Sequence, residues 1–139
     1  MDDPYNLRRF IDAQDPVYGA VCAELRAGYK TGHWMWFVFP QIQGLGHSHV
    51  ARKFAILSLD EAKAYFSHTI LGPRLIECTS LVNGIAGRTI DQILGYPDDL
   101  KFRSCMTLFA HATSDNQVFL DALRKYFGAE YDRLTLERL

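Results

Sequence analysis

The residues best suited to chemistry gather between positions 33 and 48, which read HWMWFVFPQIQGLGHS. An unbroken apolar run, residues 34–39, has His33 at one end. Polar side chains follow it: Gln41, Gln43, His47 and Ser48. Small-molecule pockets combine apolar walls with a few polar groups, so this segment predicts a pocket wall. His33 could act as an acid or base near neutral pH, or it could cap a backbone carbonyl in the core.

A second feature of this segment is its pair of glycines. Gly44 and Gly46 precede Ser48, and Arg52 and Lys53 follow in the helix that Ser48 is expected to begin. Exposed N–H groups at a helix start, reached closely through glycines, can bind a phosphate. The alternative is an ordinary turn in which Ser48 is the N-cap.

The helix expected from Asp98 carries the other group of candidate residues. At about 100° per residue, its polar edge would hold Lys101, Ser104 and His111. Lys101 would then pair with a phosphate or carboxylate, and Asp98 or Asp99 would be the nearest acid. The alternative is an amphipathic helix with this edge in solvent and Asp99 as a partner of the helix dipole.

Two further side chains could contact a ligand. Trp36 is favoured over Trp34 for stacking on a planar ring, while the other indole fills the core. Arg74 could clamp an anion, or it could brace the end of the preceding helix.

Composition excludes several classes of partner and site. Fifteen basic and sixteen acidic residues give a net charge of −1, which argues against duplex nucleic acid and anionic membranes. His47 and His49 diverge on a helix and no acidic cluster joins them, so neither a metal nor a cofactor is predicted. Three widely spaced cysteines and an N-terminus without an apolar stretch indicate a reduced, cytoplasmic protein of unknown oligomeric state.

These residues would be positioned by helices. Three segments match the capping box, at Ser58–Glu61, Thr89–Gln92 and Ser114–Gln117. Asp3-Pro4 and Asp15-Pro16 predict two more helix starts. Residues 34–39 could be a buried strand or a buried helix, and Pro40 together with the helical context favours a helix that ends there. Apolar spacing is helical and no alternation typical of strands is sustained. We expect a mostly α, multihelical fold, with residues 1–139 forming a single globular domain.

The order of motifs resembles a known family. HWMWFVFPQ, GLGHS, AYFSH, ILGPRL, DDLKFRSCMTLF and TLERL follow one another as they do in a family of short, mostly bacterial proteins of unknown function, sometimes labelled calpastatin. That label does not fit, because a polar inhibitor repeat would be disordered rather than half hydrophobic. Thr69 and Cys105 depart from the family pattern, which usually has proline and serine there. No reaction is implied by this resemblance.

The chain is more distantly similar to the NADAR proteins, small helical domains implicated in N-glycosidic bond cleavage and ADP-ribose removal. No catalytic glutamate can be aligned, because residues 31–57 contain no acid. The similarity implies an enzyme acting on a nucleotide-derived or ADP-ribose-like molecule, with N-glycosidic hydrolysis favoured. The alternative is a non-catalytic module that binds a nucleotide or a protein segment. His33, Asp98 and Asp99 are the candidate catalytic residues. The candidate ligand contacts are Trp36, Gln41, Gly44, Gly46, His47, Ser48, Arg74, Lys101 and Ser104.

Overall fold

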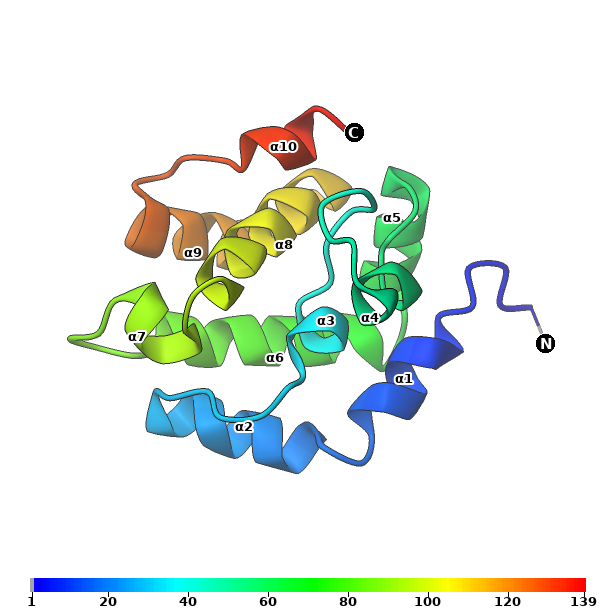
Figure 1. The fold of residues 1–139 in the computed structure, drawn as a ribbon. Coiled ribbons are helices and arrows are strands. Elements are labelled where there is room, and N and C mark those ends of the chain that lie inside the picture. The colour runs from blue at the N-terminus through cyan, green and yellow to red at the C-terminus, as the bar shows by residue number, and fades with distance from the viewer. Residues whose placement is uncertain (1) are drawn as a thin grey trace.

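The chain is built from helices joined by short connections (Figure 1). The computed structural model describes residues 2–139, and ten helices lie within them: α1 (Arg8–Gln14), α2 (Tyr18–Ala27), α3 (Met35–Val38), α4 (His49–Lys53), α5 (Leu59–Ser67), α6 (Leu71–Asn83), α7 (Ile90–Leu94), α8 (Asp98–Ala112), α9 (Gln117–Phe127) and α10 (Arg133–Leu136). Over the same residues, pairing between extended segments is confined to one isolated parallel bridge, Ile42 with Ile56. The predicted mostly α fold is confirmed.

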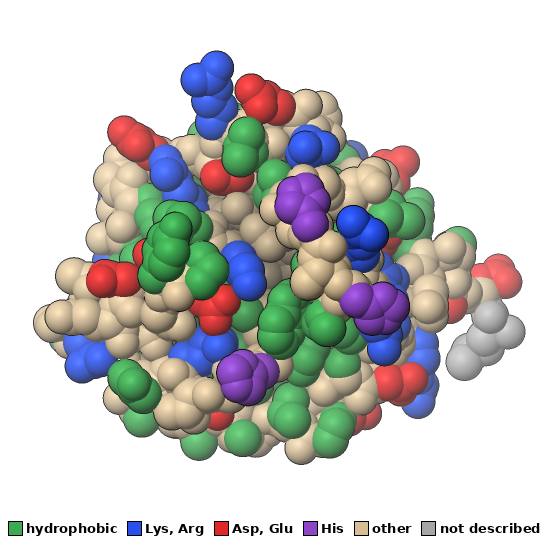
Figure 2. Space-filling model, in the orientation of Figure 1, with side chains coloured by type: hydrophobic (Ala, Val, Ile, Leu, Met, Phe, Trp, Pro, Cys, Tyr) green, Lys and Arg blue, Asp and Glu red, His purple; other side chains and the backbone are tan. Residues whose placement is uncertain are grey.

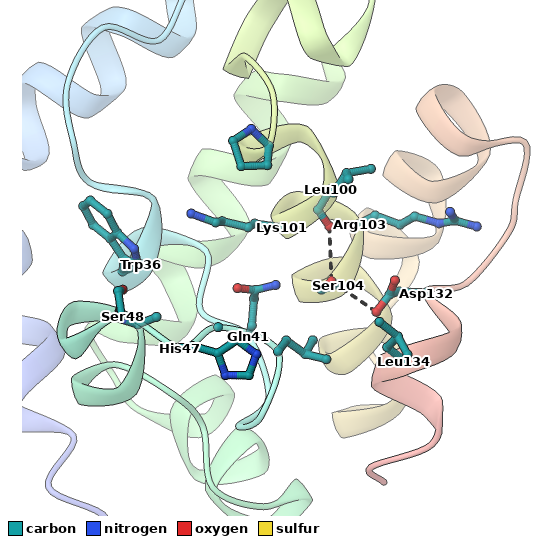
Figure 3. A pocket seen from close by; sticks show the side chains of 14 residues that line it. Trp36, Gln41, His47, Ser48, Leu100, Lys101, Arg103, Ser104, Asp132 and Leu134 are labelled. Carbon is teal, nitrogen blue, oxygen red and sulfur yellow. Dashed lines mark hydrogen bonds between the residues drawn. The ribbon is translucent and has the colours of Figure 1, made fainter.

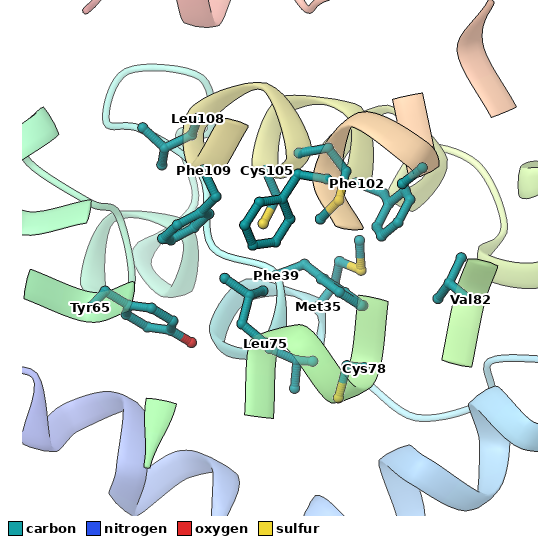
Figure 4. Packing of buried hydrophobic residues seen from close by; sticks show 14 of the residues in the cluster. Met35, Phe39, Tyr65, Leu75, Cys78, Val82, Phe102, Cys105, Leu108 and Phe109 are labelled. Carbon is teal, nitrogen blue, oxygen red and sulfur yellow. The ribbon is translucent and has the colours of Figure 1, made fainter. Parts of the chain in front are cut away.

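Helices α6 and α8 organise the packing. Helix α8 packs against α5, α7, α9 and α10, while α6 packs against α2, α5 and α9. The buried face of α8 supplies Phe102, Cys105, Met106 and Phe109, as its apolar spacing predicts. Figure 4 shows Met35 and Phe39 between α6 and α8, and the rings of Phe39 and Phe102 meet edge to face at 5.0 Å. The α3 segment is therefore wedged into the core.

Within the apolar run at residues 34–39, Met35–Val38 form the helix α3, with Trp34 and Phe39 as its caps, and most of the run is core rather than pocket wall. Trp34, Met35, Val38 and Phe39 are buried, whereas Trp36 is only half-buried. Four buried positions in six explain why the run is so apolar. Of the two half-buried residues, Phe37 packs against Phe54, and Trp36 is left to face a site.

The predicted helix starts are partly confirmed. Thr89 and Gln92 form the complete capping box of α7. Ser58 caps α5, but the Glu61 carboxylate accepts from the Leu57 amide and from Arg9 instead of closing the box. The box at Ser114 is wrong, because α9 begins only after Asn116.

The two Asp-Pro starts are also wrong. Asp15 ends α1 and α2 begins at Tyr18, so proline at position 16 lies in the connection. Asp3 accepts hydrogen bonds from the amides of Leu7 and Arg8, and thus supports the start of α1 from four residues upstream. These amide contacts lower the pKa of Asp3.

None of the helices in residues 2–139 is long and apolar enough to cross a membrane.

Candidate functional site

A pocket of about 640 Å³ opens between the loop before α4 and the helices α8 and α10. In Figure 2 it is the hollow on the face shown, with hydrophobic, basic and acidic side chains around it. Its lining is Trp36, Gln41, Leu45, Gly46, His47, Ser48, Ala51, Pro97, Leu100, Lys101, Arg103, Ser104, Asp132 and Leu134. The size and the mixture of apolar walls with a few polar groups are those of a small-molecule site.

One wall pairs an aromatic ring with a cation (Figure 3). The Lys101 ammonium lies 5.4 Å from the centre of the Trp36 ring, within cation–π range. The Asp98 carboxylate forms an ion pair with Lys101 at 3.4 Å and another with the nearly buried Lys30 at 2.8 Å. Two lysines thus share one carboxylate. This wall keeps one uncompensated positive charge, which favours an anionic ligand group.

The same wall is braced by Glu24. Its carboxylate accepts from the amides of Thr31 and Gly32 and from the Trp34 indole. Partial burial alone would raise the pKa of Glu24, but these hydrogen bonds outweigh it and lower the pKa. The N–H of the Trp34 indole is therefore already used in a hydrogen bond within the fold, whereas the N–H of the Trp36 indole has no hydrogen-bond partner among the described residues.

The opposite wall carries a carboxylate, Asp132, at the start of α10 (Figure 3). Its Oδ2 accepts from the Ser104 hydroxyl at 3.2 Å, from the Thr135 amide at 3.0 Å and from the Thr135 hydroxyl at 2.6 Å. The Asp132 amide donates to Thr107 on α8 at 2.8 Å. The side chain is therefore fixed before any ligand arrives, and its Oδ1 makes no hydrogen bond with a described residue.

The second cation of the lining, Arg103, already uses most of its guanidinium donors in hydrogen bonds within the protein. Its guanidinium donates to the carbonyls of Glu130 and Tyr131 and to the Glu130 carboxylate. These bonds hold the segment before α10 against α8. Arg103 thus supports the Asp132 wall, while Lys101 is the cation better placed for a ligand.

The rim near α4 is formed by close backbone packing. A Cβ at Gly46 would lie 2.7 Å from the Ala51 side chain, so this approach needs glycine. Ser48 caps α4 by accepting a hydrogen bond from the Ala51 amide at 3.1 Å. This is the role that Ser48 has in the ordinary turn, the alternative to a phosphate site. Helix α4 has only five residues, and its Arg52 and Lys53 are exposed and outside the pocket lining. These two cations therefore do not support a phosphate site at this segment.

The pocket brings together seven of the residues selected from the sequence: Trp36, Gln41, Gly46, His47, Ser48, Lys101 and Ser104. Gly44 lines a much smaller adjoining cavity, of about 20 Å³, which shares Trp36 and Gln41. His111, the third residue of the expected polar edge on α8, lies outside and bonds the Thr107 carbonyl.

The remaining four candidates lie outside the lining. His33 is exposed, and Arg74 pairs with Asp15 at 2.9 Å and covers the Tyr18 ring. Asp98 is held between its two lysines, and Asp99 has a buried Oδ1 without a hydrogen-bond partner. Asp98 therefore positions Lys101, and no contact places the other three at the pocket.

Asp132 is the main residue that sequence reasoning missed. It lies 28 residues after Ser104, and neither chain distance nor helical spacing connects them. The available signal was the pattern Asp132-x-x-Thr135, which fits a helix cap. That pattern predicts α10 but does not reveal that the cap faces a cavity.

Comparison with known proteins gives a family and a fold. No curated protein matches the chain. A solved structure described as the conserved hypothetical protein Rv1873 from Mycobacterium tuberculosis is 58% identical, with a TM-score of 0.98 over 99% of this chain and 98% of that one. The model of a family described as "protein of unknown function (DUF1810)" matches residues 4–139. The chain therefore belongs to this family of uncharacterised proteins.

Proposed function

We propose that the pocket binds a nucleotide-derived small molecule and hydrolyses its N-glycosidic bond. The observation that carries the proposal is the Trp36–Lys101 wall, where a cation lies over an indole and one positive charge stays uncompensated. A planar base would pack against this indole and the apolar lining, and a phosphate would pair with Lys101. The volume of about 640 Å³ is large enough for such a ligand.

Hydrolysis needs a carboxylate near the scissile bond, and Asp132 is the acid in the lining. A water oxygen would bond to the anomeric carbon while the carbon–nitrogen bond breaks and its electron pair passes to the base. Asp132 would take the water proton, and the departing nitrogen would take a proton from His47, the imidazole of the lining. Asp132 thus replaces Asp98 and Asp99 in the role expected from the sequence.

Binding is tested by titrating the protein with ADP-ribose and following tryptophan fluorescence. We expect a saturable change that is weakened about 10-fold or more in Lys101→Met, because a hydrogen-bonded charge pair is lost. Lys63→Met is the matched control, since Lys63 is exposed on α5 and does not line the pocket. A flat titration with folded protein, or an equal loss in both variants, contradicts the proposal.

A non-catalytic binding module is the second candidate, and one observation favours it. Asp132 Oδ2 is occupied by three hydrogen bonds that cap α10, as suits a rigid recognition group. Chromatography of AMP and ADP-ribose incubated with the protein separates the two functions. If the unmodified protein forms free adenine and the Asp132→Asn variant does not, the result supports hydrolysis. If the protein binds the nucleotide but forms no free adenine, the result supports the binding module.

A further inference from the structure

The Asp132 wall has a chemistry of its own, distinct from that of the Lys101 wall. Ser104 donates one proton, shared between the Leu100 carbonyl and Asp132 Oδ2, each at 3.2 Å. A hydroxyl has a single proton, so Ser104 can meet a ligand only as an acceptor. The carboxylate beside it is also an acceptor. Two adjacent acceptors therefore face the pocket on this side.

A pair of adjacent acceptors suits a ligand that presents two adjacent donors. Vicinal hydroxyls and an ammonium group both have this property. An ammonium is disfavoured, because Lys101 lines the same pocket and its wall keeps an uncompensated positive charge. A neutral diol meets no such repulsion. Carboxylates bind ribose hydroxyls in this way in dinucleotide sites.

Spacing along α8 sets the distance between the two recognition walls. Lys101 and Ser104 are three residues apart and lie on one face of the helix. One turn separates them, a rise of about 5 Å, which is the scale of a sugar ring and its phosphate ester. Figure 3 shows Lys101 directed toward Trp36 and Ser104 toward Asp132, on the two sides of the pocket.

We infer that Asp132 and Ser104 form a subsite for the cis-diol of a ribose, so that the ligand is a ribonucleotide rather than a deoxyribonucleotide. This inference rests on the proposed function, since it assigns the sugar of the same ligand. Asp132 is a specificity-determining residue here, fixed through Thr135 and Thr107. Such fixing is what allows a carboxylate to discriminate hydroxyls.

The test compares the dissociation constants of AMP and 2′,3′-dideoxy-AMP by calorimetry. We expect AMP to bind at least about 10-fold more tightly, because the dideoxy analogue leaves both acceptors of the pair unmatched. Asp132→Asn, which preserves a good helix cap, should reduce this ratio several-fold. Asp60→Asn is the matched control: it makes the same chemical change on an exposed residue of α5 outside the lining and should keep the preference for AMP.

The outcomes separate the two proposals. Equal binding of both nucleotides overturns the diol subsite while the nucleotide pocket stands. No binding of either by folded protein overturns both. If Asp132→Asn does not fold, the AMP ratio of the unmodified protein still decides the inference.

Discussion

At the scale of single residues, the fully buried carboxylate of Glu61 is compensated by Arg9. Arg9 donates to the carbonyls of Tyr5, Asn6, Lys53 and Ala55 and to the fully buried Glu61 carboxylate at 2.9 Å. It joins the N-terminal segment to the start of α5. Removing one partner of such a pair leaves a buried charge without compensation.

Arg9→Leu should therefore lower the free energy of unfolding by about 3–5 kcal/mol in urea denaturation. The adjacent Arg8 is the matched control, because its pair with Asp12 is exposed on both sides, at 69% and 63%. Arg8→Leu should change stability by less than about 1 kcal/mol. Equal losses from the two variants would show that the Glu61 pair is not what Arg9 contributes.

At the scale of helices, Gly72 makes the tight junction between α5 and α6 possible. A Cβ at Gly72 would lie 2.0 Å from the Phe66 carbonyl oxygen, a backbone atom that cannot turn aside. Helix α6 follows α5 so tightly that only a glycine fits in its first turn. Gly19, on α2, has open space where its Cβ would be.

The two glycines should consequently respond in opposite directions. Gly72→Ala should destabilise the protein by at least about 2 kcal/mol, because the two helix backbones must separate. Gly19→Ala should stabilise it by about 0.5–1 kcal/mol through helix propensity. Thermal melting of both variants measures the contrast, and a Gly72→Ala protein as stable as the parent would contradict this account of the junction.

Sequence patterns predict these elements better than they predict the site. Helical spacing identifies the buried face of α8, and Pro40 correctly limits the α3 segment. Predicted helix boundaries are wrong where tertiary contacts compete with local capping signals. The side-chain amide of Asn116 donates to the Ala110 carbonyl, and Asn116 rather than Ser114 is the N-cap of α9. The pocket joins α3, α8 and α10, so the pairing of Ser104 with Asp132 could not be read from local spacing.

Buried thiols affect the pH dependence of the whole molecule. Burial, with a smaller contribution from neighbouring Cys22, raises the pKa of Cys78 from its ordinary value to about 12, and burial raises the pKa of Cys105 as well. A raised folded-state pKa stabilises the fold fully below the unfolded pKa, about 9, and this stability is lost as pH rises toward 12.

Urea denaturation between pH 8 and pH 10.5 should therefore show a free energy of unfolding that decreases above pH 9. Cys78→Ala lacks this thiol and should show a shallower decrease over the same range. A free energy independent of pH in the unmodified protein would mean that the buried thiols do not resist ionisation.

The central claim is that the pocket beside Trp36 is a ligand site, and the two tryptophans allow a direct test. In ¹H–¹⁵N correlation spectra the chain gives two indole signals, assigned with Trp36→Phe. The Trp34 indole is buried and bonded to Glu24, whereas Trp36 lines the pocket under Lys101. Addition of ADP-ribose should shift the Trp36 signal in a saturable manner and leave the Trp34 signal almost unchanged. Two unshifted signals at saturating ADP-ribose, or a larger shift at Trp34, would contradict the claim.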